Sequence, residues 1–263
     1  MRLSTAGRSY FDGIANASPE AKEKFRQMML ELFNTTTGPS VWGYYKGGDS
    51  RNTAEDIVTE SRYWHDQGLR LRNGQTVYPR PEFTPAFANE LMKQGKSEEF
   101  AKAIRDWQKE AAETFGPFVD SFQIANEFEG SPYYTDVLGG DPFDWIATWF
   151  KQSKGFAPNV QAMINDPGAS PEYFHRFQEV LKRGGPIEAI GLQNHSSFGG
   201  PSPIQRLKDL NKFAEFGLPI EITEMEVTIR DGNDAEQRAF QRDYFREQLI
   251  AYFSHPAVHG VLL

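Results

Sequence analysis

Two hydrophobic patterns alternate along the chain. In the longer segments the apolar residues recur every three or four positions, and this spacing predicts amphipathic helices. We expect helices at residues 19–33, 53–68, 97–116, 141–155, 170–185, 202–217 and 234–255. The shorter segments are apolar runs, which predict strands at residues 40–45, 69–78, 119–125, 160–164, 187–193, 219–227 and 258–263.

Strands that alternate with helices of this length predict βαβ units and a parallel sheet. A doubly wound sheet is the alternative, but no Gly-x-Gly-x-x-Gly follows the first predicted strand and the chain has no P-loop. The pattern therefore favours an α/β fold, a (β/α)8 TIM-type barrel that residues 1–263 form as a single domain. Residues 1–18 offer no convincing strand, and the chain stops inside its last predicted strand. We therefore expect a barrel that lacks its first strand and its last helix.

The composition excludes several kinds of partner. The formal net charge of −8 argues against nucleic acid or an anionic membrane as the main partner. The chain has no cysteine, which excludes disulfides and thiolate metal sites. His255 and His259 have a spacing that suits a metal, but Pro256 lies between them and no third ligand is evident. We expect no metal and no cofactor.

Localisation and assembly are weakly constrained. The opening residues "MRLSTAGRSYFDG" contain no apolar stretch typical of a signal peptide, and no run is long enough to cross a bilayer. An extracellular or periplasmic location follows only if the full-length protein carries a signal peptide that this chain does not contain. We expect a monomer.

Polar side chains stand at the ends of several predicted strands. The C-terminal ends of the strands build the active site of a parallel barrel, so these residues should meet at one mouth. They are Asn126, Glu127, Asn165, Asp166, Gln193, His195 and Glu224. Two facing carboxylates suit glycoside hydrolysis, in which one donates a proton and the other attacks the anomeric carbon. For either glutamate alone, a helix cap or a solvated loop is an equally good interpretation.

Four of these strand ends resemble motifs of the glycoside hydrolase family 10 xylanases. "FQIANEFEG" is similar to the fourth-strand motif of that family, and "VQAMINDPG" to its fifth. "IEAIGLQNHSS" resembles the sixth-strand motif and "PIEITEMEV" the seventh. The order and spacing of the four motifs agree with the family over residues 115–263.

The resemblance implies a role for each matching residue. Glu127 would be the acid/base and Glu224 the nucleophile, with Asn126 bonded to the sugar 2-hydroxyl. His195 would orient the nucleophile, and Glu226 would support it where the family has an aspartate. Gln193 would contact the substrate, and Asn165 would support the site.

The N-terminal half departs from the family. The second strand of the family usually ends in Glu-Asn-x-x-Lys-Trp, whereas "TGPSVWGYYKGG" offers no clear Asn or Lys at matching positions. Trp42, Tyr44, Tyr45 and Lys46 are nearby, and Trp42 is the substrate-binding candidate among them. The third strand usually ends in Trp-His, but here it reads Val77-Tyr78-Pro79-Arg80. Tyr78 is expected to replace the tryptophan as a stacking face, whereas Pro79 cannot replace the imidazole.

The resemblance thus implies a retaining hydrolase that cleaves internal β-1,4 bonds of xylan or a related β-glycan by double displacement. Its partner would be a polysaccharide or an oligosaccharide. Two alternatives stay open because of the altered second and third strands. One is a catalytically impaired, carbohydrate-binding homologue. The other is a hydrolase of a different plant or algal β-glycan.

Overall fold

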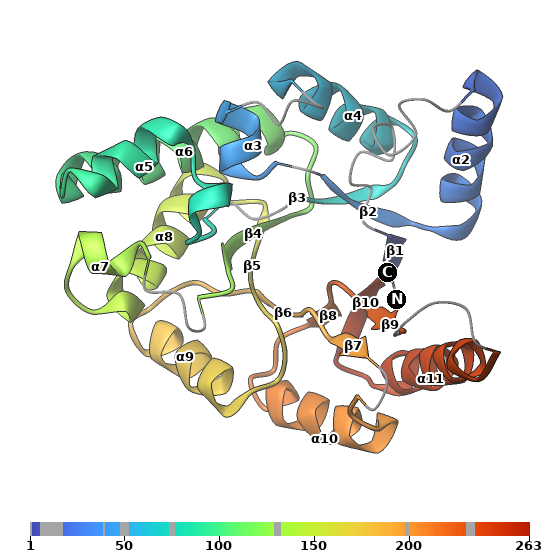
Figure 1. Cartoon of the computed structure of the whole chain (residues 1–263). Coiled ribbons are helices and arrows are strands. Elements are labelled where there is room, and N and C mark those ends of the chain that lie inside the picture. The colour runs from blue at the N-terminus through green and yellow to red at the C-terminus, as the bar shows by residue number, and fades with distance from the viewer. Residues whose placement is uncertain are drawn as a thin grey trace.

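Eight parallel strands close into a barrel, and helices surround it (Figure 1). The computed structural model describes residues 2–5, 18–38, 40–47, 53–73, 77–128, 133–197, 200–229 and 235–263. The strand order around the barrel is β1-β10-β8-β6-β5-β4-β3-β2. These strands are β1 (Arg2–Thr5), β2 (Thr35–Gly38), β3 (Arg70–Asn73), β4 (Ser121–Asn126), β5 (Gln161–Asp166), β6 (Ala189–Leu192), β8 (Ile220–Ile222) and β10 (Val258–Leu262). The predicted (β/α)8 barrel is confirmed.

The helices that follow barrel strands or precede the next one are α2 (Pro19–Leu32), α3 (Trp42–Gly47), α4 (Ala54–Asp66), α5 (Ala86–Lys93), α6 (Ser97–Phe115), α7 (Thr135–Leu138), α8 (Pro142–Phe156), α9 (Pro171–Lys182), α10 (Pro203–Ala214) and α11 (Ala235–Ser254). Seven of the helices, α2, α4, α6, α8, α9, α10 and α11, agree in position with the predicted segments, whereas α3, α5 and α7 were not predicted. A short 3-10 helix, η1 (Pro81–Phe83), lies between β3 and α5. The first residue of the predicted helix 234–255 lies outside the described residues.

Three helices start at the same local signal. In α2, α9 and α10 a serine caps the helix and a proline takes the first helical position. The backbone N–H groups of the first turn have no acceptor within the helix. The serine side chain accepts a hydrogen bond from one of them. Proline lacks an N–H and its fixed φ suits the first turn, so the pair defines the start of each helix.

Two predictions about strands are wrong, the strand at residues 40–45 and the absence of a strand in residues 1–18. Residues 40–45 form no strand, because α3 occupies most of this segment and the second barrel strand, β2, comes earlier. The sequence of β2, "TTTG", has no apolar run, yet Thr35 and Thr36 are buried. The Thr35 hydroxyl donates to the carbonyl oxygen of Arg70 at 3.0 Å, so a polar residue is accommodated in the barrel wall.

Residues 1–18 do contain a strand. β1 pairs with β10 through Arg2–Gly260, Leu3–Val261 and Ser4–Leu262, and with β2 through Ser4–Thr35 and Thr5–Thr36. These pairings close the barrel. β10 ends at Leu262, one residue before the end of the chain.

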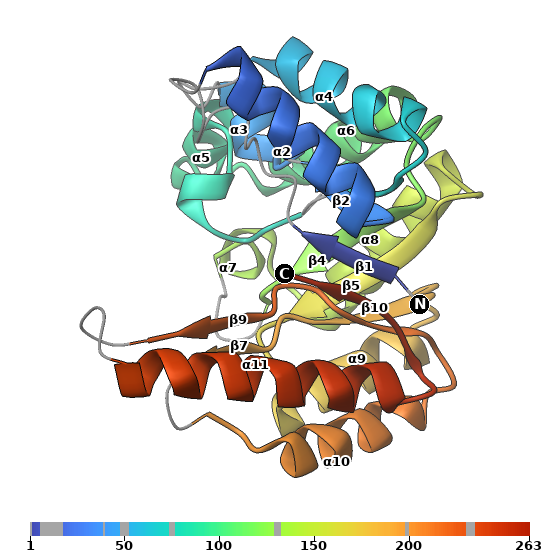
Figure 2. The same ribbon diagram turned by 90° about the vertical axis from the view of Figure 1, so that its right-hand side faces the viewer.

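A second, two-stranded sheet extends the mouth of the barrel. It consists of β7 (His195–Ser197) and β9 (Glu226–Thr228) and lies beside α11 (Figure 2). Each strand continues the chain shortly after a barrel strand, β6 and β8 respectively. β6 and β8 are neighbours in the barrel. The small sheet therefore fixes the register between the residues that follow β6 and those that follow β8.

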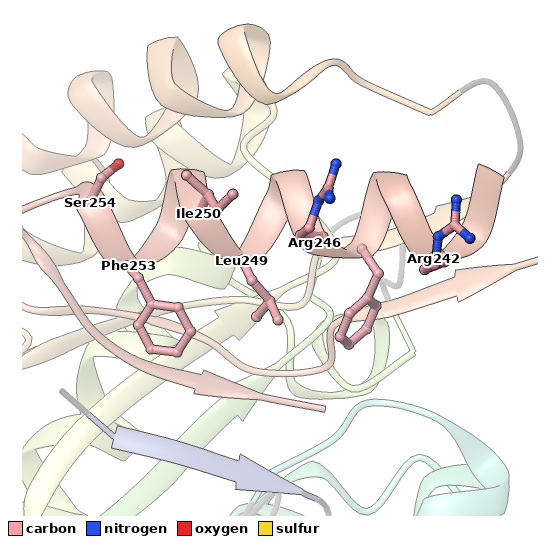
Figure 3. A pocket seen from close by; sticks show the side chains of 7 residues that line it. Arg242, Arg246, Leu249, Ile250, Phe253 and Ser254 are labelled. Atoms are coloured by element: carbon pink, nitrogen blue, oxygen red, sulfur yellow. The ribbon is translucent and has the colours of Figure 1, made fainter. Parts of the chain in front are cut away.

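One side of α11 carries a shallow pocket that includes none of the predicted site residues (Figure 3). The pocket is lined by Arg242, Phe245, Arg246, Leu249, Ile250, Phe253 and Ser254. All of its lining residues come from one helix, and none of them was predicted to act in a site. Among the described residues no helix has the length and apolarity needed to cross a membrane.

Candidate active site

The polar residues at the strand ends form one hydrogen-bond network. Asn126 and Asn165 are paired in the register of β4 and β5. Asn165 Nδ2 donates to Asn126 Oδ1 at 2.9 Å and to Glu224 Oε1 at 3.0 Å. Gln193 Nε2 donates to Glu127 Oε1 at 2.8 Å and approaches Asn126 Oδ1 at 3.5 Å. The two predicted catalytic glutamates are therefore linked through three amide side chains.

Glycine at position 191 makes room for this network. Gly191 lies beside Asn165 in the register of β5 and β6. A Cβ atom at this position would lie 2.5 Å from Asn165 Oδ1, much closer than carbon and oxygen atoms approach. The same Oδ1 accepts a hydrogen bond from the Thr223 hydroxyl at 2.7 Å, which fixes the direction of the amide. These contacts are compatible with the supporting role that the resemblance implies for Asn165, which stays a prediction.

The carboxylate of Glu127 accepts hydrogen bonds on both of its oxygens. The Tyr78 hydroxyl and Arg80 Nη2 donate to Oε2, the guanidinium at 2.7 Å, and Gln193 donates to Oε1. The side chain is only 14% exposed. The Glu127 backbone has a φ of 49°, in the left-handed region that side chains rarely adopt. Such a conformation costs on the order of 1–3 kcal/mol and is concentrated at functional sites.

The carboxylate of Glu224 has a different set of partners. His195 Nε2 lies 3.5 Å from its Oε2, and Asn165 donates to its Oε1. Burial is the largest single influence and raises the pKa of the Glu224 carboxyl, but the hydrogen bonds from His195 and Asn165 and the positive charges of Arg72 and His195 together outweigh it. The net effect is a pKa below the ordinary value, which favours the ionised carboxylate.

His195 is held between two carboxylates. Its Nδ1 lies 2.9 Å from Glu226 Oε1, and the two residues are paired in the register of β7 and β9. The hydrogen bond to Glu224 is the largest cause that raises the pKa of His195, and the charges of both glutamates add to it. The expected contact between Glu226 and the histidine is thus present, although glutamate replaces the aspartate of the motif.

The structure corrects the prediction for Trp42. This side chain is 2% exposed and packs in the core, with its ring stacked near Trp107 at a centroid distance of 6.4 Å and near Phe100 at 6.5 Å. The apolar pattern of residues 40–45 reflects the buried face of α3 rather than a strand that ends at the mouth. Trp42 is therefore not placed to bind a substrate.

Tyr78 lies in the site, but its ring is enclosed. The residue is 7% exposed, and one face is stacked on Phe83 at a centroid distance of 4.2 Å. Tyr78 therefore contributes its hydroxyl, which donates a hydrogen bond to Glu127, rather than an open ring face. Burial raises the pKa of Tyr78, and the hydrogen bond to Glu127 raises it further, so the hydroxyl stays protonated.

Two arginines near the carboxylates were not predicted. Arg80 pairs with Glu127, and buried Arg72 donates to Gln123 Oε1 at 2.6 Å inside the barrel. The alternation of Arg70, Leu71 and Arg72 was a usable signal, because alternate residues of a barrel strand face its interior. No local signal identified Arg80. Asp166, the remaining strand-end carboxylate, forms a buried ion pair with Arg176 at 2.6 Å.

A parallel barrel with two glutamates at its mouth, in different surroundings, is typical of glycoside hydrolases. The sequence model of glycosyl hydrolase family 10 matches residues 53–263 of the chain. The chain belongs to this family.

Known relatives and solved structures agree with this assignment. The chain is 28% identical to endo-1,4-beta-xylanase C of Paenibacillus barcinonensis over 144 residues, which cover 51% of the chain and 13% of that protein. It is 25% identical to endo-1,4-beta-xylanase B of Cellvibrio japonicus over 258 residues, or 96% of the chain and 40% of that protein. The chain thus spans well under half the length of these two relatives. The fold is similar to that of xylanase 10B from Thermotoga petrophila in complex with xylobiose, with a TM-score of 0.83 and 20% identity over 100% of this chain and 81% of the other.

Proposed function

We propose that the protein is a retaining endo-acting hydrolase of internal β-1,4 bonds in xylan or a related β-glycan. The observation that carries the proposal is the shared amide network between Glu127 and Glu224, in which only Glu224 is flanked by an imidazole. The relatives from Paenibacillus barcinonensis and Cellvibrio japonicus are both named endo-1,4-beta-xylanases. Their names support xylan as the first substrate to test.

The proposed reaction has two steps at one sugar carbon. In the first, a Glu224 oxygen attacks the anomeric carbon, the glycosidic C–O bond breaks and Glu127 gives its proton to the departing oxygen. In the second, water attacks the same carbon, gives a proton to Glu127 and releases the Glu224 carboxylate. Two inversions leave the anomeric configuration unchanged.

Asn126 is suited to hold the sugar during both steps. It is completely buried at the end of β4, and its Oδ1 accepts from Gln123 Nε2 at 2.7 Å and from Asn165. Its Nδ2 is a buried donor without an acceptor within the described part of the chain. An unsatisfied buried donor costs roughly 1–3 kcal/mol, which a substrate hydroxyl at this position would recover. This supports the assignment of Asn126 to the sugar 2-hydroxyl.

The stereochemistry of the product tests the proposal. Incubated with xylohexaose, the protein should release products that are initially in the β configuration, as followed by proton NMR before mutarotation. Initial α products would contradict the retaining mechanism, as would a crystal structure with the two carboxyl groups beyond about 8 Å rather than at about 5–5.5 Å.

The altered third strand end favours one comparison of substrates in particular. Tyr78 and Pro79 stand where the family has Trp-His. Tyr78 and Arg80 both donate to Glu127, and Trp42 is in the core. Xylan, mixed-linkage β-glucan and cellulose oligosaccharides should therefore be assayed side by side. Product from a β-glucan but not from xylan would support the hydrolase of a different glycan. Saturable binding without product from any of them would support the carbohydrate-binding homologue.

A further inference from the structure

The short segment that carries Arg80 is rigidly held. Pro79 and Pro81 flank the arginine and restrict the backbone on both sides. The Arg80 carbonyl oxygen accepts from the Thr84 hydroxyl at 2.7 Å and from the Phe83 N–H at 3.1 Å. A residue on such a platform presents its side chain in one direction, which suits a positioning role.

The Arg80 side chain is directed at Glu127. Its Nη2 lies 2.7 Å from Glu127 Oε2, and its guanidinium carbon lies 5.4 Å from the centroid of the Tyr78 ring. The side chain is 44% exposed, so it stands at the open edge of the site. Arg70, on the same strand-loop unit, instead pairs with Asp120 at 2.9 Å and makes no contact with the glutamates.

The three partners of Glu127 differ in what they can do during a proton cycle. The Tyr78 hydroxyl can donate or accept, so it can bond either form of the carboxyl. A guanidinium can only donate and carries a permanent charge, so its ion pair is complete only when Glu127 is ionised. In the proposed reaction Glu127 is an acid in the first step and a carboxylate base in the second. Arg80 therefore matches the second step and not the first.

We propose that Arg80 is a positioning residue for the second step, in which it holds ionised Glu127 in the orientation that accepts a proton from water. This inference rests on the proposed function. It assigns to the third strand end a role in breakdown of the glycosyl-enzyme, in addition to any contact with the sugar.

The test separates the two steps by the choice of substrate. Dinitrophenyl β-xylobioside has a leaving group that departs without a proton, so its kcat/KM reports attack by Glu224 and its kcat reports the slower second step. For Arg80→Met we expect kcat and KM to fall together by about 10- to 100-fold, the loss typical of a removed charged hydrogen bond, with kcat/KM nearly unchanged. A burst of dinitrophenolate should appear before the steady state. Azide, which attacks without a base, should restore kcat.

Two further variants control the experiment. Arg80→Lys keeps a cation at the same position and should retain a larger share of kcat than Arg80→Met. Arg70→Met removes an exposed arginine of the same unit and should leave both constants unchanged. Thermal unfolding of each variant checks that the fold is intact.

The outcomes distinguish the inference from the proposed function. Equal losses of kcat and kcat/KM in Arg80→Met, or no loss in either, would overturn the role of Arg80 alone. If the unchanged protein releases no dinitrophenolate from xylobioside or cellobioside substrates, the proposed function fails and the inference fails with it.

Discussion

The two glutamates at the mouth have the same functional group but different surroundings. Glu224 faces an imidazole that is itself paired with Glu226, and buried Arg72 adds positive charge. Glu127 faces a phenol, a guanidinium at the open edge and an amide. The first set stabilises a permanent anion, as a nucleophile requires. The second contains one partner that can bond both protonation states and one that suits only the ionised state, as expected for a group that changes its proton.

The largest expected effect comes from Glu224→Gln. Removal of the proposed nucleophile should lower kcat/KM by at least about 10⁴-fold on every substrate, including those with activated leaving groups. Initial rates with dinitrophenyl β-xylobioside measure the loss. Glu226→Gln is the matched control: it neutralises a carboxylate two residues away that pairs with His195 rather than attacking the sugar, so its loss should be much smaller. Undiminished turnover in Glu224→Gln would refute the assignment of the two roles.

Glu127→Gln should have a smaller effect that depends on the leaving group. General acid catalysis contributes about 10²- to 10⁴-fold, so kcat/KM on xylohexaose should fall within that range. The same constant for the dinitrophenyl substrate should change little, because its leaving group needs no proton. The ratio of the two losses is the quantity to measure. Equal losses on both substrates would show that the difference between the two carboxylates is not the one described above.

His195→Phe should shift the pH dependence of activity. Burial raises the pKa of the Glu224 carboxyl, and the imidazole of His195 lowers it. Without the imidazole the pKa of Glu224 should therefore rise. Because Glu224 must be ionised to attack, the acidic limb of kcat/KM should move to higher pH. The loss should be about tenfold on the acidic side, comparable to a lost charged hydrogen bond. A pH profile with the dinitrophenyl substrate checks this, and an acidic limb that stays in place would contradict the role of His195.

Gly43→Ala should have the smallest effect on activity. The effect should reach the site only through the segment that carries Arg80, the partner of Glu127. A Cβ at Gly43 would lie 2.7 Å from the Phe83 carbonyl carbon and 2.9 Å from its oxygen, so α3 and the segment of Arg80 must separate. Urea unfolding should show a loss of about 1–3 kcal/mol, with a several-fold lower kcat. Gly47→Ala is the control, because its Cβ would meet no atom within 4 Å. Equal stability of the two variants would show that this close approach does not support the site.

The C-terminal half of the barrel was predictable because its signals are local. The apolar runs of β4, β5, β6 and β8 end directly on the residues of the site, so one short stretch of sequence indicates both the strand and the functional residue. The N-terminal half lacks such signals. β2 is made of threonines and a glycine, and the aromatic residues after it belong to a helix that packs in the core. A pattern of apolar residues cannot distinguish these two kinds of burial over six positions.

The sequence by itself determined the alternation of strands and helices from β3 onward and the strand ends at which Glu127 and Glu224 stand, but it did not give β1, β2 or α3. Each of these depends on residues within a few positions of one another. Only the tertiary structure decided which charged groups face the two glutamates. Arg80 and Glu127 are 47 residues apart, and Arg72 and Thr223 are 151 apart. Such pairs meet because the barrel closes and because each strand end turns its side chains inward, and neither condition is recorded in any single stretch of the chain.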